Sequence, residues 1–78
     1  MPREFKEDVL KVVGAIDSVQ LRVVENSRGR FLDIREWIIS DNYTGWSKKG
    51  VRFRADEAPT LLHYIGDACK VIDEAEAA

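Results

Sequence analysis

Two neighbouring runs of the sequence, residues 19–26 and 31–39, alternate in side-chain type with a period of two. That is the period of a β-strand, because successive side chains of a strand point to opposite faces of its sheet. The runs are separated by Ser-Arg-Gly-Arg, in which the glycine readily adopts the positive φ angles of a tight turn. The pattern therefore predicts a β-hairpin. One face of its second strand would carry Phe31, Asp33, Arg35 and Trp37.

A further strand is predicted after the turn-forming segment that follows the hairpin. Residues 51–54, Val-Arg-Phe-Arg, again alternate with a period of two. Val51 and Phe53 would face the core, while Arg52 and Arg54 would lie on the opposite, polar face.

The N-terminal segment fits two structures. The spacing of its apolar residues suits a helix, whereas alternation over residues 9–16 suits a strand. Three β-branched residues close together favour extended backbone, so we expect a strand over residues 9–16 and keep the helix as the alternative. Residues 1–8 and 75–78 are expected to be disordered. Together with the other elements, this predicts a single domain of the α+β class spanning residues 1–78.

After Asp56, which suits a helix N-cap, apolar residues recur at spacings of three and four. They predict an amphipathic helix over residues 57–74, with two apolar rows, of which one can cover the sheet while the other meets a second helix. A chain of 78 residues buries only about 60% of its unfolded surface, so a second subunit would extend a thin core. We therefore expect a homodimer with an interface formed by Leu61, Leu62, Ile65, Cys69 and Ile72.

Several classes of chemistry lack the residues they need. Cys69 is the single cysteine and His63 the single histidine, so the chain supplies no disulfide, zinc cluster or catalytic triad of its own. Cys69 belongs to the apolar rows of the helix and is expected to be buried. Asp33 and Glu36 would point to opposite faces of a strand, which favours ion pairing over catalysis. We expect no enzymatic activity, no metal and no cofactor.

The sequence also indicates where the protein is located. The longest uninterrupted apolar stretches have two to four residues, whereas a membrane-spanning helix needs about 20. Residues 1–8 are too charged for a signal peptide. We therefore expect a cytoplasmic protein without membrane contact, associated with the nucleoid in a bacterium or present in the host cytoplasm for a virus.

The formal net charge of −2 conceals a segregation of charge along the chain. Residues 1–19 carry −1, residues 20–54 carry +4 and residues 55–78 carry −5. The basic segment also contains most of the aromatic residues, and stacking rings combined with cations suit single-stranded nucleic acid. The competing interpretation is a solvated basic face whose tryptophans lie in the core or in a dimer interface.

Two motifs in this basic segment resemble a known family. The run Arg-Gly-Arg-Phe-Leu-Asp-Ile-Arg-Glu-Trp over residues 28–37, followed by Lys-Lys-Gly-Val over residues 48–51 and then a helix, resembles the transcriptional coactivator positive cofactor four and its bacterial and phage relatives. The resemblance covers residues 16–72. It implies a curved four-stranded antiparallel sheet backed by one helix, two such chains joined as a homodimer, and single-stranded DNA lying across the sheets.

The resemblance also implies roles for individual residues. Arg35 matches a DNA-contacting arginine, Lys48 and Lys49 match a basic pair before a glycine, and Arg28 matches the basic residue of the hairpin turn. Trp37 matches a stacking aromatic of the bacterial relatives. Arg30 in the same turn, Arg22 and Arg52 on the polar faces and Trp46 beside the lysines complete the expected set. The predicted nucleic-acid contacts are thus Arg22, Arg28, Arg30, Arg35, Trp37, Trp46, Lys48, Lys49 and Arg52.

The sequence therefore predicts a protein that binds single-stranded DNA with little sequence specificity and acts as a transcription cofactor or in replication or repair. RNA and melted duplex are further candidate ligands, and the transcription or replication machinery is a candidate partner. The alternative function is a protein-interaction module that docks such a partner through its sheet or its acidic helix.

Overall fold

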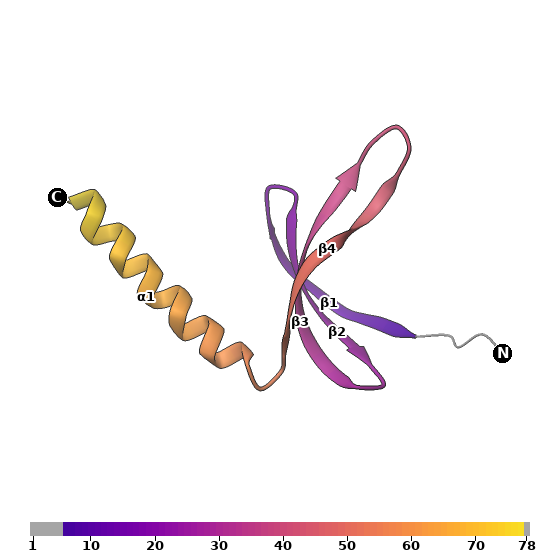
Figure 1. Ribbon diagram of the computed structural model, residues 1–78, viewed down its shortest axis with the longest axis horizontal. Coiled ribbons are helices and arrows are strands. Elements are labelled where there is room, and N and C mark those ends of the chain that lie inside the picture. The colour runs from indigo at the N-terminus through magenta and orange to yellow at the C-terminus, as the bar shows by residue number, and fades with distance from the viewer. Residues whose placement is uncertain (1–5, 78) are drawn as a thin grey trace.

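The computed structural model describes residues 6–77. Four strands, β1 (Glu7–Ile16), β2 (Val19–Asn26), β3 (Gly29–Ile39) and β4 (Thr44–Arg54), precede one helix, α1 (Ala58–Ala77). The strands form one sheet in the order β1-β2-β3-β4, and each neighbouring pair is antiparallel (Figure 1). The predicted α+β fold, a four-stranded antiparallel sheet followed by one C-terminal helix, is confirmed.

Both ends of the described chain are more ordered than predicted. The strand predicted over residues 9–16 is confirmed. β1 begins earlier than predicted, at Glu7, which pairs with Asn26 of β2. Ala75–Ala77 continue the helix. The expected disorder is therefore wrong for residues 7–8 and 75–77, and the rest of that prediction, apart from Lys6, lies outside the described residues.

The third predicted strand is longer than the alternation suggested. β4 begins at Thr44 rather than Val51, so the segment around Trp46 belongs to the sheet. Trp46 pairs directly with Trp37 of β3, and aromatic cross-strand pairs stabilise a sheet. The turn between β3 and β4 is closed by Ser40, whose hydroxyl accepts a hydrogen bond from the Tyr43 N–H at 3.1 Å.

The sheet has two faces, which we name by the residues paired across the strands. The inner face carries Arg22 and Val24 of β2, Phe31, Asp33, Arg35 and Trp37 of β3, and Trp46, Gly50 and Arg52 of β4. The outer face carries Leu21 and Val23 of β2, Leu32 and Ile34 of β3, and Val51 and Phe53 of β4.

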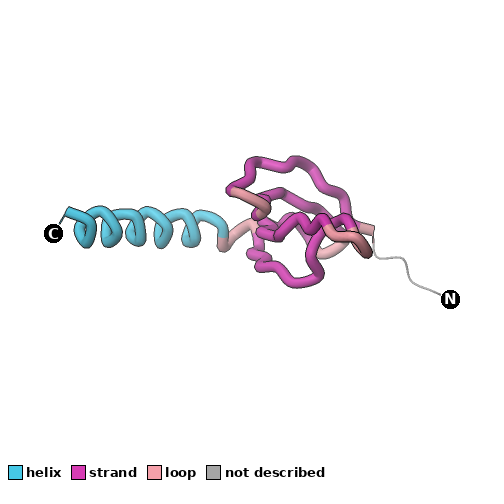
Figure 2. The backbone as a smooth tube through the Cα atoms, turned by 90° about the horizontal axis from the view of Figure 1, so that it is seen from above, coloured by secondary structure: helices cyan, strands magenta, loops and turns pink. Residues whose placement is uncertain are grey.

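The inner face is the buried one, which corrects the expected position of the core. Val24 and Asp33 are fully buried there, whereas Val51 on the outer face is 52% exposed. Within residues 6–77 no helix covers the inner face, so its burial comes from the curl of the sheet itself (Figure 2). Register shifts in β1, and one between β3 and β4, mark bulges that increase strand twist.

The helix was predicted to cover the sheet with one of its apolar rows, and it does not. α1 projects away from the strands, and none of its residues is buried (Figures 1 and 2). Cys69 is exposed rather than buried for the same reason. The helix begins at Ala58, one residue later than predicted. The Leu61 N–H donates to the carbonyl of Glu57 at 3.1 Å, so the helical hydrogen bonds start from Glu57 and not from Asp56. Glu57 is thus the N-cap residue.

No helix within residues 6–77 is both long enough and apolar enough to cross a membrane.

Candidate nucleic-acid interface

A single carboxylate organises the inner face. Asp33 is fully buried, and its oxygens accept hydrogen bonds from Arg22 Nε at 2.7 Å, from Arg35 Nε and Nη2 at 3.0 Å each, and from Arg52 Nε at 3.1 Å. The antiparallel register explains this convergence, since Arg22 of β2 and Arg52 of β4 both stand opposite Asp33 of β3. Three guanidinium groups therefore surround one buried acid.

Glu7 closes the same cluster from the first strand. Its carboxylate accepts two hydrogen bonds from Arg52, from Nη1 at 2.7 Å and Nη2 at 2.9 Å, and a third from Asn26 Nδ2 at 3.1 Å. Paired, bidentate contacts of this kind are the strong form of the ion pair. The cluster thus joins all four strands, and with three arginines and two carboxylates it retains one net positive charge.

The pKa values of the acids reflect this environment. Burial alone would raise the pKa of Asp33, but the hydrogen bonds from Arg35, Arg22 and Arg52 outweigh burial and lower it to about 2. The hydrogen bond from Arg52 lowers the pKa of Glu7 as well. Both carboxylates therefore stay ionised well into the acid range.

Arg35 also holds the backbone of β4. Between the pairs Arg35–Gly50 and Trp37–Trp46, β3 has one residue and β4 has three, residues 47–49. Arg35 Nη1 donates to the carbonyl oxygens of Ser47 at 2.8 Å and Lys48 at 3.0 Å within this bulge. Its guanidinium lies over Gly50, where a Cβ atom would approach Arg35 Cζ to 2.8 Å. A side chain at position 50 would therefore force the bonded guanidinium to shift.

These contacts give the three inner arginines a structural role in addition to the predicted contact with nucleic acid. Their side chains are 7% exposed for Arg22, 16% for Arg35 and 29% for Arg52. Every nitrogen of Arg35 and Arg52 already donates to the carboxylates or to the β4 backbone. These bonds hold the sheet together, and they leave the inner arginines less available to a phosphate than the exposed Lys48 and Lys49.

The tryptophans form a pair at the end of the inner face that is nearest the β3–β4 turn. Trp37 and Trp46 meet edge to face, with ring centroids 4.8 Å apart and an angle of 84° between the rings. The Arg22 guanidinium covers the Trp46 ring at 4.2 Å, a cation–π contact that extends the charged cluster to the aromatic pair. Tyr43, half-exposed, donates its hydroxyl to the Trp46 carbonyl at 2.7 Å.

The exposed cations are distributed unevenly. Lys48 and Lys49 are exposed on the β4 bulge, between Trp46 and Gly50. Arg28 is exposed in the β2–β3 turn, at the opposite end of β3 from the tryptophans. Arg30 lies on the outer side, where Nε pairs with Glu25 at 2.9 Å.

The structure thus brings together most of the predicted nucleic-acid contacts and places two of them elsewhere. Seven of the nine predicted residues lie on the inner face or its β4 border, and Arg28 and Arg30 lie apart from them. Glu7 and Tyr43 are members that sequence reasoning missed. Tyr43 lies among turn residues of the basic segment and could have been included on that ground. No sequence signal indicates Glu7, because its contact with Arg52 joins residues 45 positions apart.

No protein-family model, curated protein or solved structure matches this chain. Within the described residues, no three His, Cys, Asp or Glu side chains are grouped closely enough to hold a metal ion.

The Asp33 cluster predicts a characteristic acid response. A carboxylate whose pKa falls from an unfolded value of about 3.9 to about 2 stabilises the fold by about 2.5 kcal/mol above pH 4, and this stabilisation is lost as the pH falls toward 2. Asp33→Asn should cost about 3–5 kcal/mol at neutral pH, because it leaves three arginines underpaired. The deficit should shrink between pH 4 and 2 in urea unfolding curves. Asp41→Asn, in an exposed turn, is the control, and a deficit that does not change with pH would contradict the assignment.

Substitution by alanine should change the stability of the fold in opposite directions at Gly50, which contacts Arg35, and at Gly66, which has open space around it. Gly50→Ala should destabilise the fold by about 1–3 kcal/mol, since the methyl group must displace a guanidinium that is held at both ends. Gly66→Ala has open space in an exposed helix and should stabilise by about 0.5–1 kcal/mol. Thermal unfolding of the two variants gives the comparison. A neutral Gly50→Ala would show that Arg35 is not fixed over Gly50.

Proposed function

We propose that this protein binds single-stranded nucleic acid at the hairpin surface, defined as Trp37, Tyr43, Trp46, Lys48 and Lys49. The observation that carries the proposal is the placement of an edge-to-face tryptophan pair directly beside two exposed, adjacent lysines on one bulged strand. Bases need flat stacking partners and the backbone needs cations, and this surface offers both within a few residues.

The tryptophan pair would provide the stacking contribution. Both tryptophans are only partly buried, so part of each ring remains available to a ligand although the rings contact one another. The Arg22 guanidinium lies over the Trp46 ring, and the Tyr43 hydroxyl donates to the Trp46 backbone carbonyl, so little ordering of this residue is needed on binding. Stacking on aromatic rings contributes about 1–3 kcal/mol per base and tolerates any base. Sequence preference would accordingly be weak.

The lysines would provide the electrostatic contribution. Lys48 and Lys49 are exposed, and no ion pair within the described residues engages either of them. Lysine acts on phosphate as a mobile point charge, so the contacts would hold a backbone without reading its sequence. The buried cluster adds one net positive charge beneath the same face, which favours a polyanion.

The resemblance to the positive cofactor four family supports the same ligand by a different route. Its two motifs contribute Asp33, Arg35 and the Lys-Lys-Gly segment, which in this chain build and hold the bulge that presents Lys48 and Lys49. A role in transcription, replication or repair is part of the proposal, since these processes expose single strands. The hairpin surface has no feature that distinguishes DNA from RNA.

The lysine contribution can be measured as a salt dependence. Binding of fluorescein-labelled oligo-dT, followed by anisotropy, should weaken steeply with salt. Replacing both Lys48 and Lys49 by alanine should reduce the slope of log affinity against log salt by about 1.4, since each phosphate contact on a single strand contributes about 0.7. Lys70→Ala on the helix should leave the slope unchanged. Absence of oligo-dT binding by the unaltered chain at low salt would refute the proposal.

The stacking contribution can be separated from charge by substitutions at one ring. Trp46→Ala should weaken oligo-dT binding by about tenfold, and by more if two bases stack, whereas Trp46→Phe should retain most of the affinity. The loss should be the same at low and high salt, because no phosphate contact is removed. Equal affinity of Trp46→Ala and the unaltered chain would exclude Trp46 from the binding surface.

A further inference from the structure

The charge of the sheet changes sign at the tryptophan pair. Residues 12–21 and 36–46, which we call the acidic end, hold the β1–β2 and β3–β4 turns and contain three acidic residues and no Lys or Arg. Residues 22–35 and 47–54, which form the rest of β2, β3 and β4 with the β2–β3 turn, contain eight basic residues and two acidic ones. Trp37 and Trp46 pair with each other at the border between the two regions.

Two of the three acids lie in the turns of the acidic end. Asp41 is exposed in the β3–β4 turn and is the first charged residue beyond the tryptophans along both strands. Asp17 is exposed in the β1–β2 turn, next to Ser18, whose carbonyl accepts the Trp37 N–H at 2.8 Å. Glu36 is on the outer face, where its carboxylate accepts the Ser18 hydroxyl at 2.9 Å. A ligand that passed beyond the tryptophans would therefore approach Asp41.

The cations lie on the other side of the tryptophan pair. Lys48 and Lys49 are exposed on the bulge, and the Asp33 cluster with its net positive charge lies next to them toward the middle of the sheet. Toward the turn, the same face carries Ile39, which is 78% exposed, opposite Thr44. A base stacked on the tryptophans thus has cations on one side and only uncharged and acidic residues of the described chain on the other.

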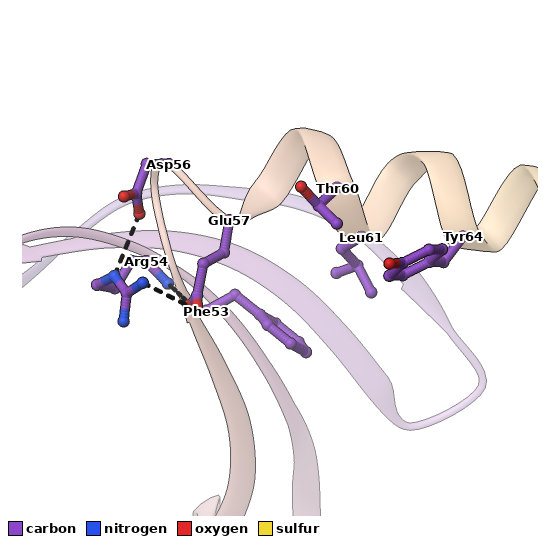
Figure 3. Close-up of a pocket in the computed structure, with 7 residues that line it drawn as sticks. All are labelled: Phe53, Arg54, Asp56, Glu57, Thr60, Leu61 and Tyr64. Atoms are coloured by element: carbon purple, nitrogen blue, oxygen red, sulfur yellow. Dashed lines mark hydrogen bonds and ion pairs between the residues drawn. The ribbon is translucent and has the colours of Figure 1, made fainter.

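The opposite end of β4 offers stacking rings without free cations. A hollow of about 420 Å³ lies there, lined by residues that include Phe53 and Tyr64. The arginine of its rim, Arg54, is paired with Asp56 and Glu57 at 3.2 Å each (Figure 3). The acids outnumber the cation at this hollow, so it does not favour a phosphate backbone. The hairpin surface is the better place for stacking and phosphate contacts to act together.

We propose that the hairpin surface takes the end of a single strand, with the terminal base on the tryptophan pair and the phosphates that follow it on Lys48 and Lys49. This inference rests on the proposed nucleic-acid binding and adds which part of the ligand is bound. An internal nucleotide has a phosphate on both its 5′ and its 3′ side, whereas a terminal nucleotide that ends in a hydroxyl has a phosphate on one side. That arrangement matches a surface with cations on one side of the stacking rings.

A strand that continued past the tryptophans would carry phosphates toward Asp41. Charges act on one another over about 8 Å at physiological ionic strength, and the phosphates of consecutive nucleotides lie within that distance. Like charges brought together in an interface lower affinity. The acidic end therefore opposes the middle of a strand and leaves its terminus favoured.

A closed circle of single-stranded DNA separates this inference from the proposed function, because a circle has bases and phosphates but no ends. Linear and circular oligo-dT of about 30 nucleotides, longer than the roughly 4–16 that one single-strand-binding domain covers, compete against an internally labelled linear strand. The linear strand should compete about tenfold better. Equal competition by the two would overturn end binding and leave the proposed function intact, whereas no binding of either would refute both.

Reversal of one charge in the turn tests the physical cause. Asp41→Lys places a cation beyond the tryptophans, so it should strengthen binding of the circle by about tenfold and binding of the linear strand by much less. Asp73→Lys, which makes the same charge change on an exposed position of α1, should leave the ratio of the two affinities unchanged. An equal gain for both ligands in Asp41→Lys would overturn the inference, because the turn would then act on every strand alike.

Blocking the ends of the linear strand identifies the terminus that is bound. Streptavidin is bound to biotin at the 5′ end, at the 3′ end or at both. A block at both ends should lower the affinity to that of the circle, and the single blocks show whether the 5′ or the 3′ end provides the contact. Unchanged affinity for the strand blocked at both ends would overturn the inference.

Discussion

The fold depends on the burial of one ionised carboxylate. Removing the Asp33 carboxylate from water costs free energy unless its charge is fully compensated. Arg22 of β2, Arg35 of β3 and Arg52 of β4 supply that compensation. The arrangement is possible only when β2, β3 and β4 hold one register, since a slip by one residue would turn Arg22 or Arg52 to the opposite face. The cluster thus specifies the register, and through Glu7 it ties β1 to the far edge of the sheet.

The same cluster separates architecture from binding. Arg35, which a sequence motif assigns to a ligand, is engaged with a carboxylate and with backbone carbonyls, and the exposed cations beside the tryptophans are the lysines on the bulge that Arg35 holds open. Gly50 contributes to this bulge because it leaves room for the Arg35 guanidinium. Nucleic-acid binding at the hairpin surface would therefore depend on the inner arginines indirectly, through the placement of Trp46, Lys48 and Lys49.

The two faces of the sheet differ in burial and in the side chains that they carry. The inner face is closed by curvature and carries the charged cluster, while the outer face and the helix remain uncovered within one chain. With a single fully buried apolar side chain among residues 6–77, the described part of the chain lacks the hydrophobic burial that usually stabilises a fold.

The sequence by itself determined most of the elements: alternation specified β2, β3 and the last residues of β4, the three-and-four spacing specified the helix, and charge segregation marked the basic, aromatic segment. It did not determine which face is buried, because both faces carry apolar residues, such as Val24 on one and Val23 on the other. The tertiary structure decided this through bulges that curl the sheet and through contacts such as Glu7 with Arg52, which join distant positions. It also decided the direction of the helix, since local hydrogen bonds at Glu57 set an orientation that the apolar stripe does not encode.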